Sequence, residues 1–238
     1  IKYYNITKHG NFGGKNILNI IGNDKAKDKF GEILNILLEE RYKRIPPERD
    51  RKKLTFGNAQ VIFSLAYLGR IFDNDEFKEE AKCGDRFISE NLIKNGSILR
   101  YAHSNIPGFL EDYSYLALAY IELYKMEKEE TYLSKAKAIS DKMISYFYDD
   151  MDGGFYLSQK EGKQILRRTK DIYDGAYPSG NSAAIFALVL LKNILNTKEY
   201  DHIISNSFYG IGGEVNKNEA SYTFLLLSLN QLTLGVDR

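Results

Sequence analysis

Two kinds of helical pattern alternate along the chain, and this alternation limits the folds that it can adopt. In residues 25–44 apolar side chains recur at helical spacing and charged side chains fill the opposite face. This pattern predicts an outer helix that is half covered. Residues 54–72 are apolar on nearly every side, which only a helix surrounded by neighbours tolerates. We therefore expect an inner helix to follow an outer one.

The same alternation repeats toward the C-terminus. Residues 75–93 and 129–147 are amphipathic, whereas residues 110–124, 181–195 and 219–234 are more apolar and predict inner helices. Strand-like segments occur only in the connections, at residues 97–102, 154–158 and 164–169, the last two around a turn at 161–163. The pattern is therefore one of helical hairpins with short extended connections.

Alternating covered and half-covered helices predict two concentric layers, which is the all-α, α/α-toroid fold of six-hairpin glycosidases. A helix bundle would leave every helix half exposed, and a tetratricopeptide solenoid would need a fixed repeat, which is absent. We predict one such domain over residues 1–238, with short β-hairpins in the connections. Six hairpins need about twelve helices, and about seven are recognisable. We therefore expect an arc of the toroid, from the C-terminal portion of a larger protein.

Charge and composition exclude several classes of partner. Lys and Arg total 33 against 32 Asp and Glu, so no positive excess favours nucleic acid or anionic lipid. The longest apolar stretch, residues 183–191, has about half the length of a membrane span. Cys83 is the single cysteine, and no cysteine-rich metal motif is present. We predict a cytoplasmic protein with no metal, no cofactor, no nucleic-acid partner and no membrane association.

The starts of the inner helices are where a ligand is expected. In a toroid these ends converge on one rim, where free backbone N–H groups and helix dipoles can receive ligand oxygens. Polar or glycine-bearing segments stand there, at residues 53–58, 108–113, 174–182 and 216–221. Asn58 and Tyr113 in the first two segments are candidate substrate-binding residues.

The segment 174–182 has two interpretations. Ser179, Asn181 and Ser182 supply side-chain oxygens directly before an apolar run, which is the usual composition of a helix cap. The same residues can instead line a polar cavity and bind substrate. Tyr173 and Tyr177 lie nearby and can pack against sugar rings, although tyrosines often belong to the core. Both interpretations stay open at this point.

Asp112 and Asp174 are the candidate catalytic carboxylates. Glycoside hydrolysis requires two carboxyl groups, one on each side of the scissile bond, as general acid and as base or nucleophile. The alternative for Asp112 is a charge that interacts with the helix dipole, with Glu111 as its solvent-facing neighbour.

His103 and Arg168 are further candidates. His103 stands in a loop before an inner helix and can exchange protons near neutral pH, so we include it among the catalytic candidates. Arg168 can bind an anionic substrate group or form a surface ion pair. The acidic segment 149–154 lacks the ligand spacing of an EF-hand, so a turn explains it better than calcium binding.

Several of these segments also resemble a known family. A Gly-Asn-Phe-x-Gly-Lys-Asn-Ile-Leu string covers residues 10–18, and an Asp-x-x-x-Pro-Ser-Gly-Asn-Ser string covers residues 174–182. Together with residues 53–58, 108–113 and 152–155, they resemble large thioredoxin-domain-containing proteins that include a spermatogenesis-associated member. The resemblance implies an N-terminal thioredoxin-like domain followed by a six-hairpin toroid similar to N-acylglucosamine 2-epimerase.

Two departures limit what the resemblance implies. Family members carry a tryptophan before the asparagine that matches Asn58, and this chain contains no tryptophan. Epimerase relatives use a pair of histidines, whereas His103 is the one suitable histidine here. We therefore keep two predictions of function. One is a hydrolase-like or epimerase-like toroid with a small carbohydrate ligand, and the other is a non-catalytic module that presents clients to a thioredoxin-like domain.

Overall fold

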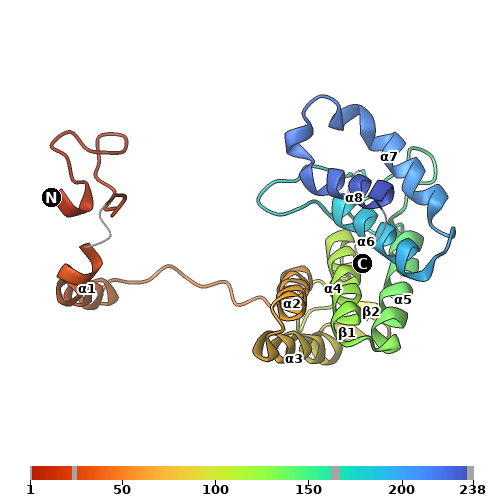
Figure 1. Cartoon of the computed structure of the whole chain (residues 1–238), viewed down its shortest axis with the longest axis horizontal. Helices are drawn as coiled ribbons and strands as arrows, with labels where there is room; N and C mark the ends of the chain where they lie inside the picture. Colours follow the sequence, from red (N-terminus) through yellow and green to blue (C-terminus); the bar gives the residue numbers. More distant parts are fainter. Residues whose placement is uncertain (1, 23–25, 162–166, 235–238) are drawn as a thin grey trace. The chain divides into compact units, whose positions relative to one another are not determined.

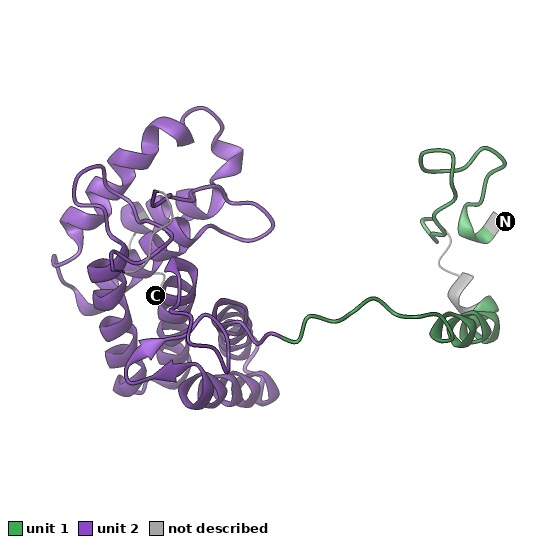
Figure 2. Ribbon diagram, turned by 180° about the vertical axis from the view of Figure 1, so that it is seen from behind, with its two compact units in different colours: residues 1–51 green, residues 52–238 purple. Residues whose placement is uncertain are grey.

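A computed structural model of the chain describes residues 2–22, 26–161 and 167–234. The chain divides into two compact units, Ile1–Arg51 and Lys52–Arg238 (Figure 2). The first unit contains the 3₁₀ helix η1 (Lys2–Tyr4) and the helix α1 (Ala26–Tyr42). The prediction of a single domain over the whole chain stays a prediction.

Asparagine side chains hold together the loop between η1 and α1. Asn11 accepts a hydrogen bond from the backbone N–H of Ile17 (2.7 Å) and donates one to its carbonyl (2.8 Å). Asn16 forms the same two-way pair with Thr7. Gly10 has a φ of +83°, and a Cβ there would lie 2.5 Å from the backbone of Gly14. The glycine and asparagines of the 10–18 string therefore shape a tight loop.

The second unit contains the helices that carry the toroid pattern (Figure 1). Their bounds are α2 (Thr55–Ile71), α3 (Asp75–Asn91), α4 (Leu110–Glu127), α5 (Glu130–Phe147), α6 (Gly180–Leu195), α7 (Asp201–Val215) and α8 (Thr223–Leu234). A two-stranded antiparallel hairpin, β1 (Ile93–Lys94) and β2 (Ser97–Ile98), follows α3. The short 3₁₀ helix η2 (Glu219–Ser221) precedes α8.

The helices of the second unit form two layers. Two predictions differ: α1, expected as an outer helix, belongs to the first unit, and α2, expected to be covered on every side, buries one face. The inner helices pack in series, α2 against α4, α4 against α6 and α6 against α8. The outer helices α3, α5 and α7 pack on α2, α4 and α6 respectively. Every residue of α4 from 110 to 123 and of α6 from 180 to 191 is buried, whereas α3 and α5 bury only one face. The predicted all-α toroid architecture is confirmed.

Helix α7 was missed by the sequence patterns. Its three glycines, Gly210, Gly212 and Gly213, lower helix propensity and interrupt the apolar stripe. At least one of them is there for packing, because a Cβ on Gly210 would lie 1.9 Å from the carbonyl oxygen of Asp152. A Cβ on Gly153 would likewise lie 2.1 Å from the carbonyl oxygen of Asn206. These contacts bring the turn at residues 149–154 directly onto α7.

Three other predicted elements differ in extent. The strand expected at 97–102 is limited to β2, and the one at 154–158 is reduced to a single bridge between Tyr148 and Phe155. Half of the partner segment 164–169 lies outside the described residues, and in the other half the Thr169 carbonyl accepts from the N–H of Leu157 (2.8 Å). The helix expected at 219–234 divides at Tyr222, whose φ and ψ of −138° and 35° are not helical.

None of the helices within the described ranges has both the length and the apolar composition that a bilayer crossing requires. The most deeply buried helices, α4 and α6, are instead covered by the neighbouring helices of the same unit. Their composition is therefore explained by burial in the inner layer.

Candidate functional site

The buried carboxylate of Asp112 joins the starts of two inner helices. Its Oδ1 accepts a hydrogen bond from the backbone N–H of Phe56 in α2 (3.0 Å). Its Oδ2 accepts from the N–H of Phe109, directly before α4 (2.8 Å), and from Nη1 of Arg100 (3.1 Å). The Asp112 side chain has no exposed surface. Both oxygens are therefore occupied by groups of the protein itself.

Burial raises the pKa of Asp112 from 3.8 to about 6, because the charged form loses its hydration. The Arg100 guanidinium and the two backbone N–H groups act in the opposite direction, but they do not cancel the cost of burial. The buried carboxyl group of Asp112 therefore keeps its proton up to a higher pH than an exposed aspartate does.

Asp174 joins the other two inner helices in a similar way. Its Oδ1 accepts from the backbone N–H of Ser179 at the start of α6 (2.9 Å). Its Oδ2 accepts from the N–H groups of Phe224 (2.9 Å) and Leu225 (3.3 Å) in the first turn of α8. The structure therefore brings the starts of α2, α4, α6 and α8 together in two pairs, and we call the surface that they form the inner-helix rim.

Ser179, Ser182 and Asn181 all have structural partners. Ser179 is the N-cap of α6, and its Oγ accepts from the backbone N–H of Ser182 (3.0 Å). Asn181 accepts from the N–H of Phe155 (2.7 Å) and donates to its carbonyl (2.9 Å) and to that of Asp171 (2.8 Å). All three side chains are buried. The helix-cap interpretation accounts for the serines, and a backbone clamp accounts for Asn181.

Tyr113 and Asn58 are also held by the fold. Tyr113 is fully buried, and its ring packs edge to face on Phe147 with the centroids 5.2 Å apart. Asn58 donates from Nδ2 to the carbonyl of Leu54 (2.7 Å), one turn earlier.

Arg168 braces a loop. It donates from Nε (3.0 Å) and Nη2 (2.6 Å) to the carbonyl of Ser158, and from Nη2 to the carbonyl of Tyr146 (3.0 Å). Its guanidinium carbon lies 4.0 Å from the centroid of the Tyr156 ring. These contacts occupy several of the N–H donors of Arg168 and one face of its guanidinium plane.

His103 lies in a different place from the two carboxylates. It is exposed, has a φ of +62°, and lines a polar cavity of about 460 Å³ with Glu90, Asn91 and Lys94. None of the other predicted site residues lines this cavity. The structure therefore does not place His103 in the group formed by Asp112 and Asp174.

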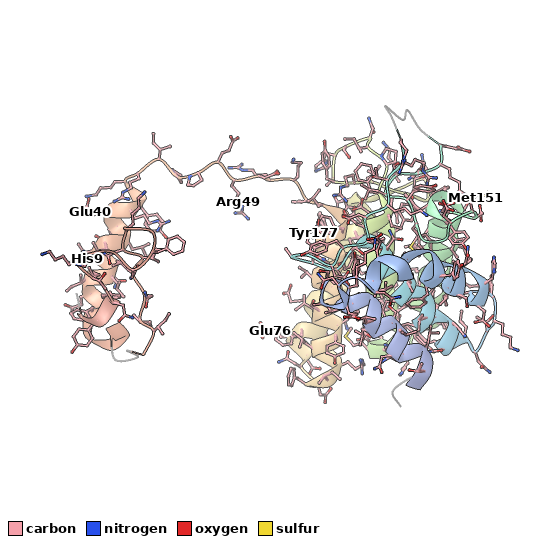
Figure 3. The ribbon with its side chains drawn as sticks, turned by 90° about the horizontal axis from the view of Figure 1, so that it is seen from above. His9, Glu40, Arg49, Glu76, Met151 and Tyr177 are labelled. Carbon is pink, nitrogen blue, oxygen red and sulfur yellow. The ribbon has the colours of Figure 1, made fainter. Side chains whose placement is uncertain are left out.

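Four residues outside the predicted site list meet at the inner-helix rim: Phe56, Arg100, Glu111 and Tyr177. Tyr177 was noted in the sequence as able to pack on a sugar, and Glu111, expected to face solvent, is 8% exposed. The Arg100 guanidinium lies 5.0 Å from the ring centroid of Phe56 and donates from Nη1 to Oε2 of Glu111 (3.0 Å). The ring of Phe56 lies 5.4 Å from that of Tyr177, which is 44% exposed (Figure 3). Among the described residues, no hydrogen bond uses the second oxygen of Glu111. The acidic pair formed by Glu111 and Asp112 was a second sequence signal.

The charge of Glu111 reaches Tyr177. Its proximity is the largest cause of the raised pKa of Tyr177, ahead of partial burial. An aromatic face, a hydroxyl, a carboxylate and a guanidinium thus lie within one small area. This combination can bind a polar ligand with an apolar face.

The acidic turn at residues 149–154 needs no metal ion to explain it. Asp149 accepts from the backbone N–H of Met151 (3.0 Å) and pairs with Lys170 (2.6 Å). These contacts hold the pKa of Asp149 below its usual range, although burial acts in the opposite direction. Within the described part of the chain, no three His, Cys, Asp or Glu residues gather to hold a metal.

Comparison with known proteins identifies relatives. No protein-family model matches the chain. Human spermatogenesis-associated protein 20 is 27% identical over 236 residues, which cover 84% of this chain and 30% of the human protein. This match confirms the predicted family. An uncharacterized protein of Caenorhabditis elegans is 24% identical and covers 95% of this chain. The chain spans only about a third of the length of each of these relatives.

Solved structures share the fold. Cellobiose 2-epimerase from Spirochaeta thermophila superimposes with a TM-score of 0.61 at 13% identity, over 77% of this chain and 54% of that enzyme. An α-1,6-mannanase of a Salegentibacter species matches with a TM-score of 0.56 at 16% identity, over 80% of this chain and 56% of that one. That mannanase is a variant made inactive by changing two consecutive aspartates to asparagine, in complex with α-1,6-mannotriose. At these identities the likeness shows the fold.

Proposed function

We propose that the inner-helix rim is a carbohydrate-binding site, with Phe56 and Tyr177 as its aromatic platform and Glu111 and Arg100 as its polar groups. The observation that carries this proposal is the pair of rings 5.4 Å apart beside a carboxylate that keeps one oxygen open. A sugar has the matching chemistry, because its C–H faces pack on aromatic rings and its hydroxyls bind charged groups strongly.

The position of the rim supports the same proposal. Ligand sites are commonly concave surfaces that combine aromatic side chains with a few polar groups. Here those groups stand at the starts of inner helices, where the helix dipoles favour ligand oxygens. The fold neighbours named above include an epimerase and a mannanase that act on sugars, which agrees with a carbohydrate ligand.

For catalysis, we propose Glu111 as the acid that contacts the ligand. The oxygens of Asp112 and Asp174 already accept backbone N–H groups, so both residues serve as positioning residues in this proposal. The inactive mannanase variant changes two consecutive acids, and this chain carries its own consecutive pair at the start of α4. A second carboxylate for hydrolysis would have to come from elsewhere in the full-length protein.

A second function follows from that requirement. Each oxygen of the predicted catalytic pair is occupied. Glu111 and the exposed Asp171 are the acids that act on Tyr177, and each has one oxygen without a hydrogen bond among the described residues. The rim would then bind without catalysing, as part of a module that accompanies a thioredoxin-like domain in the longer family members. The predicted roles of His103 and Arg168 stay predictions, and neither residue has a role in the proposed catalytic rim or in the proposed binding module.

The binding proposal is tested by titrating the protein with mannobiose, cellobiose and N-acetylglucosamine in thermal-shift and calorimetric experiments. A ligand at about 100 times its Kd stabilises the folded state by about 2.7 kcal/mol, which raises Tm by several degrees for a chain of this size. Tyr177→Ala and Glu111→Gln should each weaken binding at least about tenfold, the loss expected when a contact worth about 1.4 kcal/mol is removed.

Tyr173→Ala is the matched control, because Tyr173 is an exposed aromatic on the same loop, and no ring contact joins it to Phe56. It should bind sugars like the unmodified protein. Sugar binding that is unchanged in Tyr177→Ala would contradict the proposal, as would the absence of binding to every sugar in the full-length protein. Measuring hydrolysis and epimerisation of a bound sugar then distinguishes a catalytic rim from a binding module.

A further inference from the structure

A second, separate cavity lies between the outer helices. It is bounded by the end of α3, the β1–β2 hairpin, α4 and α5, and has a volume of about 180 Å³. Its walls are mostly apolar and include Ile93, Ile98 and Ile139. A dry apolar cavity of roughly 150 Å³ is large enough to bind benzene. The space therefore fits a ligand with one ring.

A buried hydroxyl without a partner belongs to this cavity. Tyr120 of α4 is 1% exposed and lines the cavity. Its Oη makes no hydrogen bond of good geometry, although the side chains of Ser89 and Asp85 lie close enough to act on its pKa. Tyr115 on the same helix is also buried, but its hydroxyl donates to the carbonyl of Pro178 (2.6 Å). Leaving a buried donor unsatisfied is unfavourable. Burial raises the pKa of Tyr120, so its hydroxyl stays protonated and can donate a hydrogen bond to a ligand.

Two lysines of α5 add positive charge to the cavity. The Nζ of Lys135 lies 5.0 Å from the ring centroid of Tyr120 and pairs with Asp85 (3.1 Å). The Nζ of Lys142 donates to the carbonyl of Gly96 in the hairpin turn. Each ammonium carries three donors, so each keeps donors beyond these contacts. With the Asp85 carboxylate against two ammonium groups, the charge around the cavity favours an anion.

We propose that this cavity binds a small carboxylate with a single apolar ring, whose ring packs among the three isoleucines and whose carboxylate accepts hydrogen bonds from Tyr120 and Lys142. A fully hydrated inorganic anion would gain nothing from the apolar walls. A neutral ring compound would gain no electrostatic attraction from Lys135 and Lys142. The ligand class follows from the cavity itself and does not depend on the carbohydrate proposal.

The proposal is tested with benzoate as the probe and benzyl alcohol as its neutral counterpart. Binding is measured on the whole chain by ligand-observed NMR and by thermal shift. Benzoate should bind with millimolar or better affinity and benzyl alcohol at least several-fold more weakly. Tyr120→Phe should weaken benzoate binding about tenfold while leaving Tm of the free protein unchanged, since its hydroxyl has no partner to lose.

Two controls separate the cavity from a general effect. Tyr113→Phe removes another buried hydroxyl without a partner from α4, outside the lining of this cavity, and should leave benzoate binding unchanged. Ala138→Phe adds bulk at the exposed edge of the lining and should abolish binding without unfolding the protein.

Either of two results would overturn the proposal. One is the absence of benzoate binding at concentrations on the order of 10 mM. The other is benzoate binding that is equally strong in Tyr120→Phe and Ala138→Phe.

Discussion

The inner-helix rim contains acidic residues of two kinds. Asp112 and Asp174 hydrogen-bond to the starts of neighbouring helices, and we call these two sets of contacts the joints. Within the described part of the chain, Glu111 is an acid of the rim that does not bridge two helix starts. In the joints, Asp112 and Asp174 accept backbone N–H groups from neighbouring helix starts through both of their oxygens. On the rim, Glu111 lies next to Asp112 in the sequence and binds the same Arg100. Among the described residues, only one of its carboxylate oxygens accepts a hydrogen bond. Adjacent acids thus differ in their contacts: Asp112 holds two helix starts, and Glu111 is the one that we propose for ligand binding.

The largest expected difference between the two regions is in stability. Asp112→Ala leaves Arg100 and the N–H groups of Phe56 and Phe109 without their acceptor, so the free energy of unfolding should fall by about 3–5 kcal/mol. Chemical denaturation measures this loss. Asp150→Ala is the control, because Asp150 is exposed and pairs only with Lys160 among the described residues, and its loss should be near zero. Equal losses in both variants would contradict the assignment of Asp112 to a joint.

The pH dependence of stability should carry the signature of Asp112. Its pKa is raised to about 6 in the folded chain from 3.8, so the folded state binds the proton more tightly between these values. This group therefore contributes stability at low pH that is lost as the pH rises through about 6, by about 3 kcal/mol at most.

The measurement for that prediction compares the chain with Asp112→Asn from about pH 4 to about pH 6.5, across the window of the raised pKa. The stability difference between the two should change in favour of Asp112→Asn as the pH rises. A difference that stays constant over this range would show that the Asp112 pKa is not raised.

Asp174→Ala should have the next largest effect. It removes the acceptor for the N–H groups of Ser179, Phe224 and Leu225, and losing this cap at two helix starts should cost about 2 kcal/mol. Thermal unfolding should show the loss, and hydrogen exchange should localise it to the first turns of α6 and α8. Asp171→Ala keeps the backbone carbonyl that Asn181 uses and serves as the control. Unchanged exchange at both helix starts would remove Asp174 from the joints.

Glu111→Gln should have the smallest effect on stability, less than about 1 kcal/mol, because glutamine still offers an oxygen to Arg100. Its effect should be on ligand binding instead. If this variant destabilised the chain as much as Asp112→Ala, the distinction between rim and joint would fail. Thermal unfolding of the two variants side by side decides the matter.

The inner and outer layers could be predicted because the burial of a helix determines which of its own residues must be apolar. A helix covered on every side must be apolar on every side, which identified α4 and α6 from their own residues. Helix α2 has the same apolar composition but buries only one face, so there the pattern overstated its burial. The sequence of helix α7 shows no continuous apolar stripe, because three glycines interrupt it. Gly210 is explained by the approach of a turn some 50 residues earlier, at Asp152 and Gly153, and no local pattern reports that contact.

The site was harder to predict for a related reason. Asp112 and Asn181 are residue types common at ligand sites, and their position before apolar helices was correctly recognised. What decides their role is the origin of their partners, such as the Phe56 N–H for Asp112 and the Phe155 backbone for Asn181. These partners come from distant parts of the chain. The burial of Glu111 and the exposure of Tyr177 are likewise properties of the assembled rim.

The two carboxylate joints bear on how related sequences should be interpreted. Asp112 and Asp174 tie together four helix starts, so each would be retained wherever this arc of helices folds. A relative that had lost every activity would still keep both acids, and a survey of sequences would see two invariant aspartates resembling a catalytic pair. Variation at Glu111 and Tyr177 is the more informative guide to which relatives share a ligand.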